Sequence, residues 1–315
     1  MNDDLSPTCP LTVRTGFSVA LLLSALAITF PAGAQAASSI FGTTGSYPTG
    51  IAVDSSGNVY TSNLDSNTVT KITRTGKSSV LGRTGGGPYA IAVDKTGNIY
   101  TANNYSNNVT KITRAGKSST LGTTNGSPSA ITVDKAGNVY TANFLSDNVT
   151  KITPNGKSSV LGRTARGPSA ITVDKVGNVY TANWIANNVT KITPKGASSV
   201  LGTTGNGPFG IAVDNAGNVY TANNVEDANT VTKITRAGKS STLGTTGANP
   251  FAITVDKAGN VYTANYDANT VTKITRSGKS STLGTTGRSP IAITVDKAGS
   301  IFTANYDSNN VSKLR

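Results

Sequence analysis

The sequence predicts an all-β fold, a seven-bladed β-propeller with four strands in each blade. A unit of about forty residues occurs seven times. Each unit holds four short β-branched segments bounded by turn residues, which leaves no room for a helix. The last unit lacks its fourth segment, and a lone copy of that segment stands before the first unit. These three observations together indicate repeats that close into a ring.

The units align on a proline that precedes an apolar segment. The spacing between these prolines is 40 residues, and once 42. The two extra residues are Glu226 and Asp227, which we place in a loop. The seven anchor positions are Pro48, Pro88, Pro128, Pro168, Pro208, Pro250 and Pro290.

The third unit shows the expected elements in order. Strand a covers residues 128–134, strand b 139–143, strand c 148–153 and strand d 157–162. The a–b turn, Asp-Lys-Ala-Gly, has Asp first and Gly fourth, as a type I turn prefers. Strands a and b should therefore form a tight hairpin, and Gly156 should serve the c–d turn in the same way.

The strand d that the last unit lacks is found at the other end of the repeat region. The last unit has strand a at 291–296, strand b at 300–305 and strand c at 310–314, and then the chain ends. The missing strand d is expected at residues 38–42. If the two termini share one blade, the ring closes and leaves no open inner edge. A linear solenoid would not need this complementation.

Residues 1–36 have the layout of a secretory signal. Arg14 precedes an apolar run over residues 17–30, and the small residues Ala34-Gln35-Ala36 follow. We predict cleavage after Ala36, a signal peptide over 1–36, a propeller over 37–315, and a secreted, periplasmic or cell-envelope location. The apolar run is shorter than the roughly 20 residues that span a bilayer. The alternative is an uncleaved N-terminal anchor.

The composition excludes several kinds of site. The chain has no His, and its one Cys (Cys9) and one Met (Met1) both lie in the predicted leader. The mature chain therefore cannot form disulfides, thiolate nucleophiles, His general bases or most zinc, copper and iron sites. We expect no cofactor, although oxygen-ligand sites for Ca²⁺ or Mg²⁺ are compatible with the composition.

The repeat motif resembles a known group of propellers. Each unit approximates Pro-x-x-Ile-Ala/Thr-Val-Asp-x-x-Gly-Asn-Val-Tyr-Thr-Ala-Asn, which resembles the NHL repeat. It is also similar to repeats of the seven-bladed streptogramin B lyases and of extracellular sensor propellers on bacterial receptor kinases. The resemblance covers residues 38–315 and implies fold more strongly than function, because such propellers host many roles.

The lyase resemblance also implies a His general base and a Mg²⁺ site on one face of the propeller. This chain has no His for that role. The carboxylates expected on the varied face lie on different blades without evident pairing, and Glu226-Asp227 is the one local cluster. These carboxylates are Asp65, Asp147, Glu226, Asp227, Asp267 and Asp307.

The b–c and d–a connections should lie together on one face, which we call the loop face. They vary between units and carry aromatic residues, as do the positions directly after the prolines. Exposed aromatics on loops of a rigid scaffold are typical of recognition surfaces. The alternatives are that the rings cap the fold and pack between blades, or that the loops drifted without selection. The predicted ligand-binding residues are Tyr89, Tyr105, Phe144, Trp184, Phe209, Phe251, Tyr266 and Tyr306.

The a–b and c–d turns should form the opposite face, which we call the turn face. It hardly varies and is basic, in a chain with a net charge of +13. Such a field attracts anionic polymers, lipid headgroups or cell-wall phosphates, although solvated turns that keep the protein soluble are the alternative. The candidate anion-binding residues are Arg74, Lys77, Arg114, Lys117, Lys157, Lys195, Arg236, Lys239, Arg276 and Lys279; the a–b turns add Lys95, Lys135, Lys175, Lys257 and Lys297.

Three sevenfold rings are expected to build the blades. One is a Lys in strand c, such as Lys151, and one is an Asn that ends strand b, such as Asn143. The third is an Asp that ends strand a and should accept turn N–H groups; a cation at this ring is the alternative. The Asp residues are Asp54, Asp94, Asp134, Asp174, Asp214, Asp256 and Asp296.

The sequence therefore favours an exported scaffold that binds a protein, glycan or small ligand through its loop face, without catalysis. We expect a monomer, and no nucleic-acid partner, because export removes it from nucleic acid and no aromatics interleave with the turn-face cations. One alternative is a streptogramin-lyase-like enzyme that has lost or replaced the family's His. Another is a structural envelope protein held to anionic polymers by its basic face.

Overall fold

A computed structural model of the protein describes residues 38–225 and 228–315. The predicted signal peptide and the inserted pair Glu226 and Asp227 lie outside the described residues. Within them, 28 strands form seven four-stranded antiparallel sheets. No helix in this part of the chain is long and apolar enough to cross a membrane.

The strands follow the predicted order in every blade. The innermost strands begin at the repeat prolines: β2 (Pro48–Val53), β6 (Pro88–Val93), β10 (Pro128–Val133), β14 (Pro168–Val173), β18 (Pro208–Val213), β22 (Pro250–Val255) and β26 (Pro290–Val295). The second strands are β3 (Val59–Asn63), β7 (Ile99–Asn103), β11 (Val139–Asn143), β15 (Val179–Asn183), β19 (Val219–Asn223), β23 (Val261–Asn265) and β27 (Ile301–Asn305).

The third strands are β4 (Thr68–Ile72), β8 (Asn108–Ile112), β12 (Asn148–Ile152), β16 (Asn188–Ile192), β20 (Thr230–Ile234), β24 (Thr270–Ile274) and β28 (Asn310–Leu314). The outer strands are β5 (Ser78–Arg83), β9 (Ser118–Thr123), β13 (Ser158–Arg163), β17 (Ser198–Thr203), β21 (Ser240–Thr245), β25 (Ser280–Thr285) and β1 (Ser39–Thr43). We number the blades 1 to 7 by their innermost strands, from β2 to β26.

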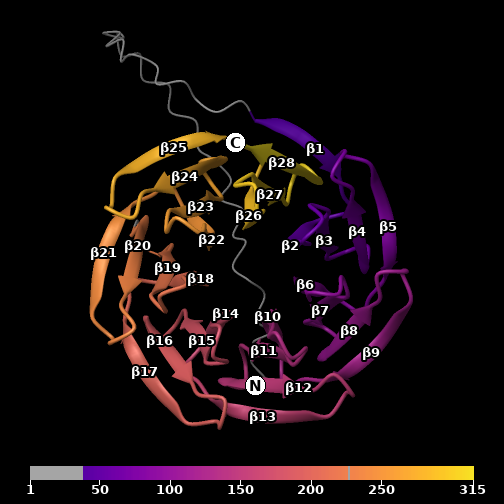
Figure 1. Ribbon diagram of the computed structural model, residues 1–315, viewed down its shortest axis with the longest axis horizontal. Helices are drawn as coiled ribbons and strands as arrows, with labels where there is room; N and C mark the ends of the chain where they lie inside the picture. The colour runs from indigo at the N-terminus through magenta and orange to yellow at the C-terminus, as the bar shows by residue number, and fades with distance from the viewer. Residues whose placement is uncertain (1–37, 226–227) are drawn as a thin grey trace, which may run out of the picture. The chain divides into compact units, whose positions relative to one another are not determined.

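The ring closes as the strand count predicted. Blade 7 has the order β1-β28-β27-β26, so its outer strand comes from the N-terminal end of the propeller (Figure 1). The pairing runs from Ser39 opposite Lys313 to Thr43 opposite Asn310. The innermost strand of blade 1, β2, packs against those of both blade 2 and blade 7. The prediction of a seven-bladed propeller is confirmed.

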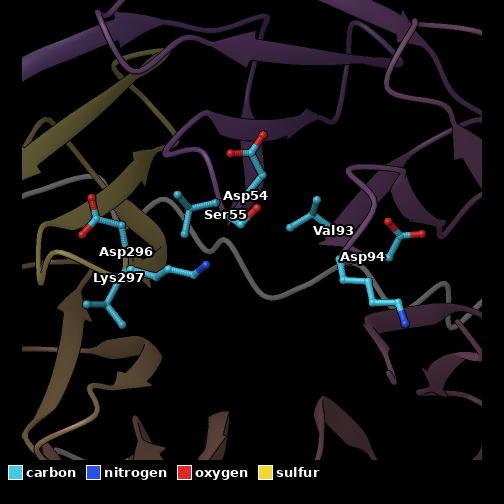
Figure 2. A pocket seen from close by; sticks show the side chains of 9 residues that line it. Asp54, Ser55, Val93, Asp94, Asp296 and Lys297 are labelled. Carbon is cyan, nitrogen blue, oxygen red and sulfur yellow. The ribbon is translucent and has the colours of Figure 1, made fainter. Parts of the chain in front are cut away.

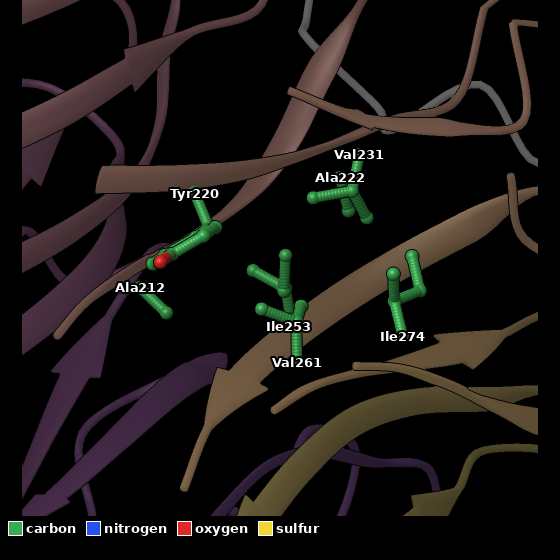
Figure 3. Close-up of a cluster of buried hydrophobic side chains, with 7 residues drawn as sticks. All are labelled: Ala212, Tyr220, Ala222, Val231, Ile253, Val261 and Ile274. Atoms are coloured by element: carbon green, nitrogen blue, oxygen red, sulfur yellow. The ribbon is translucent and has the colours of Figure 1, made fainter. Parts of the chain in front are cut away.

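The hydrophobic core lies between neighbouring blades. Tyr220 and Ala222 on β19 meet Ile253, Val261 and Ile274 of the next blade (Figure 3). Alternate residues of a strand point to opposite faces of its sheet, so each blade presents one such layer to each neighbour. The same set of positions recurs at the other interfaces, which explains why these residues hardly vary among the seven units.

The strand-c lysines belong to the same interface. Lys151 is opposite Tyr140 in the β11–β12 register, and its ammonium group lies 5.9 Å from the centre of that ring. Lys111, Lys233 and Lys273 repeat the contact with their own tyrosines. A cation over an aromatic face is attracted to it, so these four lysines contribute to the structure of their blades, in line with the prediction.

The Asp that ends each innermost strand organises its a–b turn. In blade 3, Oδ1 of Asp134 accepts the backbone N–H groups of Ala136 and Asn138, both at 2.9 Å. Oδ2 accepts the amide of Asn138 and the hydroxyl of Tyr140. Burial alone would raise the pKa of Asp134, but these hydrogen bonds hold it below its ordinary value. The prediction that the Asp ring accepts turn N–H groups is confirmed.

Candidate functional site: the loop face

Each b–c loop begins on a buried asparagine at the end of the second strand. Asn143 is fully buried, and its Oδ1 accepts the hydroxyl of Thr141 at 3.1 Å. Its Nδ2 group donates to Asn148 at 2.7 Å and to Thr150 at 2.8 Å, both on β12. The network ties the two ends of the loop together and fixes where the next residue, Phe144, leaves the sheet.

A second asparagine ties each b–c loop to the following blade. Asn107 has a φ of 49°, in the left-handed region that Asn tolerates better than most residues. Its Oδ1 accepts the backbone N–H of Ser127, directly before the blade 3 proline, at 2.7 Å. In blade 3 the same position is Asp147, which accepts from Gly167 at 2.8 Å. A carboxylate works equally well there because the bond needs one oxygen acceptor.

We did not predict this inter-blade bond from the sequence, although a signal was present. The last residue of every b–c loop is Asn or Asp, while the residues before it vary. The set is Asn67, Asn107, Asp147, Asn187, Asn229, Asn269 and Asn309. The variable loops are therefore anchored at both ends on every blade.

Three of the predicted aromatic residues form one cluster over blades 5 and 6. Phe209 and Phe251 occupy the position after the proline, and their ring centres are 4.4 Å apart. Tyr266, the first residue of the blade 6 b–c loop, lies 5.0 Å from Phe251. Trp184 of blade 4 lies against Gly207, two residues before Phe209, since a methyl group on Gly207 would lie 3.0 Å from its Nε1.

A second aromatic pair joins blade 7 to blade 1. Tyr306 packs against Tyr47 with ring centres 4.7 Å apart. Sequence reasoning missed Tyr47, which lies in a d–a connection with a φ of 54° and is 38% exposed. Burial, with the nearby charges of Asp65 and Asp307 and the neighbouring tyrosines, raises the pKa of Tyr306 to about 12. The pair therefore lies in a locally negative part of the loop face.

Three further predicted aromatics are Tyr105, Tyr89 and Phe144. Tyr105 is 71% exposed, and its ring covers Gly87, where a methyl group would lie 2.6 Å away. Tyr89 and Phe144 are half-buried. The structure thus brings Phe209, Phe251 and Tyr266 into contact and pairs Tyr306 with a residue that we did not predict.

Two of the described loop-face carboxylates accept hydrogen bonds from neighbouring side chains. Asp307 accepts a hydrogen bond from the hydroxyl of Ser289, and Asp267 accepts one from the amide of Asn249. Magnesium prefers several oxygen ligands around one point. Over residues 38–225 and 228–315, no group of three or more His, Cys, Asp or Glu residues could hold a metal ion. The Mg²⁺ site that the lyase resemblance implies therefore has no match among the described residues.

The turn face carries the predicted cations on exposed turns, and the channel opens there into a small pocket. The pocket holds about 240 Å³ and is lined by Val53, Asp54, Ser55, Val93, Asp94, Lys95, Val295, Asp296 and Lys297 (Figure 2). Its three carboxylates already accept hydrogen bonds from their own turns. This pocket lies at the opposite end of the channel from the predicted aromatic residues.

The fold and sequence place the chain in a known family. The model of the virginiamycin B lyase family matches residues 31–228. The chain belongs to this family. Membership confirms the resemblance to streptogramin B lyases that the repeats predicted. No curated protein matches the chain.

Solved structures similar to this virginiamycin B lyase family member share its architecture at low identity. A streptogramin B lyase is 20% identical, with a TM-score of 0.78 over 91% of this chain and 99% of that one. A catalytically inactive histidine-to-alanine variant of virginiamycin B lyase from Staphylococcus aureus, with quinupristin, is 19% identical, with a TM-score of 0.75 over 86% and 95%. Hydrazine synthase of Kuenenia stuttgartiensis is also 19% identical, with a TM-score of 0.72 over 91% and 99%. At these identities the likeness shows the fold alone.

Proposed function

We propose that this member of the virginiamycin B lyase family is an exported scaffold that binds a protein, glycan or small ligand through its loop face. The contact of Phe209, Phe251 and Tyr266 carries the proposal, and Trp184 lies against Gly207, two residues before Phe209. These rings come from blades 4, 5 and 6, which are separate along the chain. All four are half-buried: Phe209 and Phe251 lie near the start of β18 and β22, and Trp184 and Tyr266 lie on the b–c loops.

The chemistry of these side chains suits recognition. Large aromatic rings offer much contact area at a low cost in conformational entropy, and such residues dominate binding energy at many interfaces. The rings stand on strands and loops held at both ends by the buried and left-handed asparagines. A prearranged surface loses less free energy on ordering when it binds.

A comparison with other blades indicates that these rings are not needed to pack the propeller. The position of Phe209 and Phe251 is a serine in blades 3 and 4. There Ser129 donates to the carbonyl of Pro168 at 2.7 Å, and Ser169 donates to Pro208 at 2.8 Å. The same backbone is therefore built with small hydroxyl side chains, and the aromatic rings are available for another role.

Lyase activity is the second candidate, because it is what the family is named for. The solved relative with quinupristin is described as inactive after one histidine was replaced by alanine. The present chain has no histidine. We therefore propose that the fold has been kept without the lyase reaction.

The single tryptophan of the chain offers a direct test, because Trp184 is on the loop face and lies against Gly207, two residues before Phe209. Protein, polysaccharide and small-molecule pools from the source organism's envelope would be titrated while tryptophan fluorescence is recorded. We expect one pool to change the signal saturably. The double variant Phe209→Ser and Phe251→Ser, built from residues of blades 3 and 4, should weaken that binding at least about tenfold, since a fully buried hot-spot residue contributes about 2 kcal/mol.

A matched control changes exposed apolar residues on the outer strands. Val80 and Val200 are exposed there, and the same position is Thr in blade 2. Val80→Thr with Val200→Thr should leave the binding unchanged. Equal binding by wild type and the Phe double variant would contradict the proposal. Turnover of quinupristin by the purified protein would contradict the absence of catalysis.

A further inference from the structure

The cations of the turn face form sets at different distances from the channel. The a–b turns join the two inner strands of a blade, and the c–d turns join its two outer strands. Lysines that follow the ring Asp therefore surround the channel, while the c–d turn cations lie farther out. The inner set is Lys95, Lys135, Lys175, Lys257 and Lys297, all exposed. In blades 1 and 5 this lysine is replaced by Ser55 and Asn215.

The outer arginines are held in position by packing. The stem of Arg114 covers Gly97 in the a–b turn of its own blade; a methyl group there would lie 3.5 Å from its Cδ. Arg74, Arg236 and Arg276 make the same contact in blades 1, 5 and 6. In blades 3 and 4 a proline covers the glycine instead. In blade 7 the outer strand is β1, so no c–d turn joins it to β28 within the described residues. The four arginines therefore lie on blades 5, 6, 1 and 2.

The negative charges on this face are already engaged. Its fifteen Lys and Arg side chains face seven carboxylates, all from the Asp ring. Those carboxylates accept hydrogen bonds within their own turns, as Asp134 does. The opposite end is different: among the described residues it carries Asp65, Asp147, Asp267 and Asp307 against Arg83, Arg163, Arg166 and Arg288, so the two signs balance there. The excess positive charge of the propeller is therefore concentrated at one end.

We propose that the turn face is a second binding surface, independent of the loop face, and that it takes a linear phosphate-rich polymer. Phosphates spaced along a chain can meet cations at successive turns, and each contact releases counterions. The channel-side lysines and the four arginines offer such a path across several blades.

A polymer fits this face better than a lipid bilayer. Stable attachment of a protein to a membrane surface usually needs apolar side chains that enter the lipid as well as charge. Among the described turns, Val176 is the exposed large aliphatic side chain. The other large exposed aliphatic residues lie on the outer strands or in b–c loops, away from the turn face. The turn face therefore offers charge with little to insert.

The test measures binding of fluorescently labelled inorganic polyphosphate by anisotropy as a function of salt. One variant replaces Lys95, Lys135, Lys257 and Lys297 with Ser, the residue of blade 1. The matched control removes the same charge from the loop-face end, as Arg83→Thr, Arg163→Thr, Arg166→Ser and Arg288→Ser. The control substitutions place residues that other blades carry, or small polar ones, at exposed positions.

We expect wild type to bind polyphosphate with an affinity that falls steeply as salt rises. Each phosphate contact contributes roughly 0.7 to the slope of log affinity against log salt. Loss of the four lysines should therefore reduce the magnitude of that slope by up to about 3. The control variant should keep the wild-type slope. Equal losses in both variants would show attraction by net charge alone and overturn the proposal. Tighter binding to phosphatidylglycerol vesicles than to polyphosphate at equal phosphate would also overturn it, in favour of a membrane.

Discussion

The two ends of this propeller differ in what the repeat has held constant. At the turn face, nearly every blade has the same Asp, Gly and Asn at the same places. At the loop face, the b–c loops differ in sequence between blades, although the strands that they join have the same lengths. The structure shows why. The anchors of the loops lie in the buried Asn and the left-handed Asn, so the residues between them are free to change.

The largest expected effect comes from removing a loop anchor and comparing it with the next residue. Asn143→Ala would leave buried hydroxyl and amide groups on Thr141, Asn148 and Thr150 without their partner. We expect a loss of about 3 kcal/mol of unfolding free energy in urea titrations. Phe144→Asn, which introduces the residue of blade 2, should cost less than about 1 kcal/mol. Similar losses would show that the loop residue is itself structural.

The turn face contains its own matched pair, because blade 7 departs from the pattern. Asp296 has Ser300 and Phe302 where Asp134 has Asn138 and Tyr140, so it accepts just two backbone N–H groups. Asp134→Asn should lower the free energy of unfolding by about 2 kcal/mol, because the NH₂ group that replaces Oδ2 cannot accept the hydrogen bonds of Asn138 and Tyr140. Asp296→Asn should cost about half as much in the same urea titration. The reverse order would contradict the account of the ring.

The carboxylate of Asp134 also gives a pH dependence. The pKa of Asp134 is below its ordinary value of 3.8, so its contribution to stability is present above that value and is lost as the pH falls through the lower folded pKa. Thermal unfolding from pH 6 to pH 2 should therefore show less acid destabilisation in Asp134→Asn than in wild type. An identical acid profile would show that this carboxylate does not couple to folding.

A smaller effect is expected from the inter-blade bond. Asn107→Gly keeps the left-handed backbone but removes the acceptor for Ser127 N–H. We expect the free energy of unfolding to fall by about 1 kcal/mol. Hydrogen exchange should become faster only in the neighbourhood of Ser127. Asn107→Asp should keep the bond, as Asp147 does in blade 3. If both variants behave alike, the side-chain acceptor is not what holds the loop.

The smallest effect on stability is expected from the turn-face lysines. Lys95, Lys135, Lys257 and Lys297 are exposed, and exposed charges away from close partners change stability by less than about 0.5 kcal/mol. Their replacement by Ser should leave the urea midpoint unchanged while it changes polyphosphate binding. A large shift in the midpoint would mean that this face serves folding as well.

The fold could be predicted almost completely because the same unit occurs seven times in the sequence. The proline register, the Asp–Gly turns and the orphan strand at 38–42 each followed from local patterns, and the strand is observed at Ser39–Thr43. The candidate site could be predicted only as a list of aromatic residues. That Phe251 meets Phe209 and Tyr266, or that Tyr47 meets Tyr306, depends on contacts between blades, which no local pattern encodes.

The central claim is that recognition belongs to the loop face, and hydrogen exchange can compare both faces in one experiment. Wild-type protein would be labelled with and without the envelope pool that changes Trp184 fluorescence, in enough salt to screen the turn-face cations. The account predicts protection in segments 205–210, 249–252 and 264–268, with none in the a–b turns. Protection confined to the a–b turns, such as residues 134–138, would contradict it.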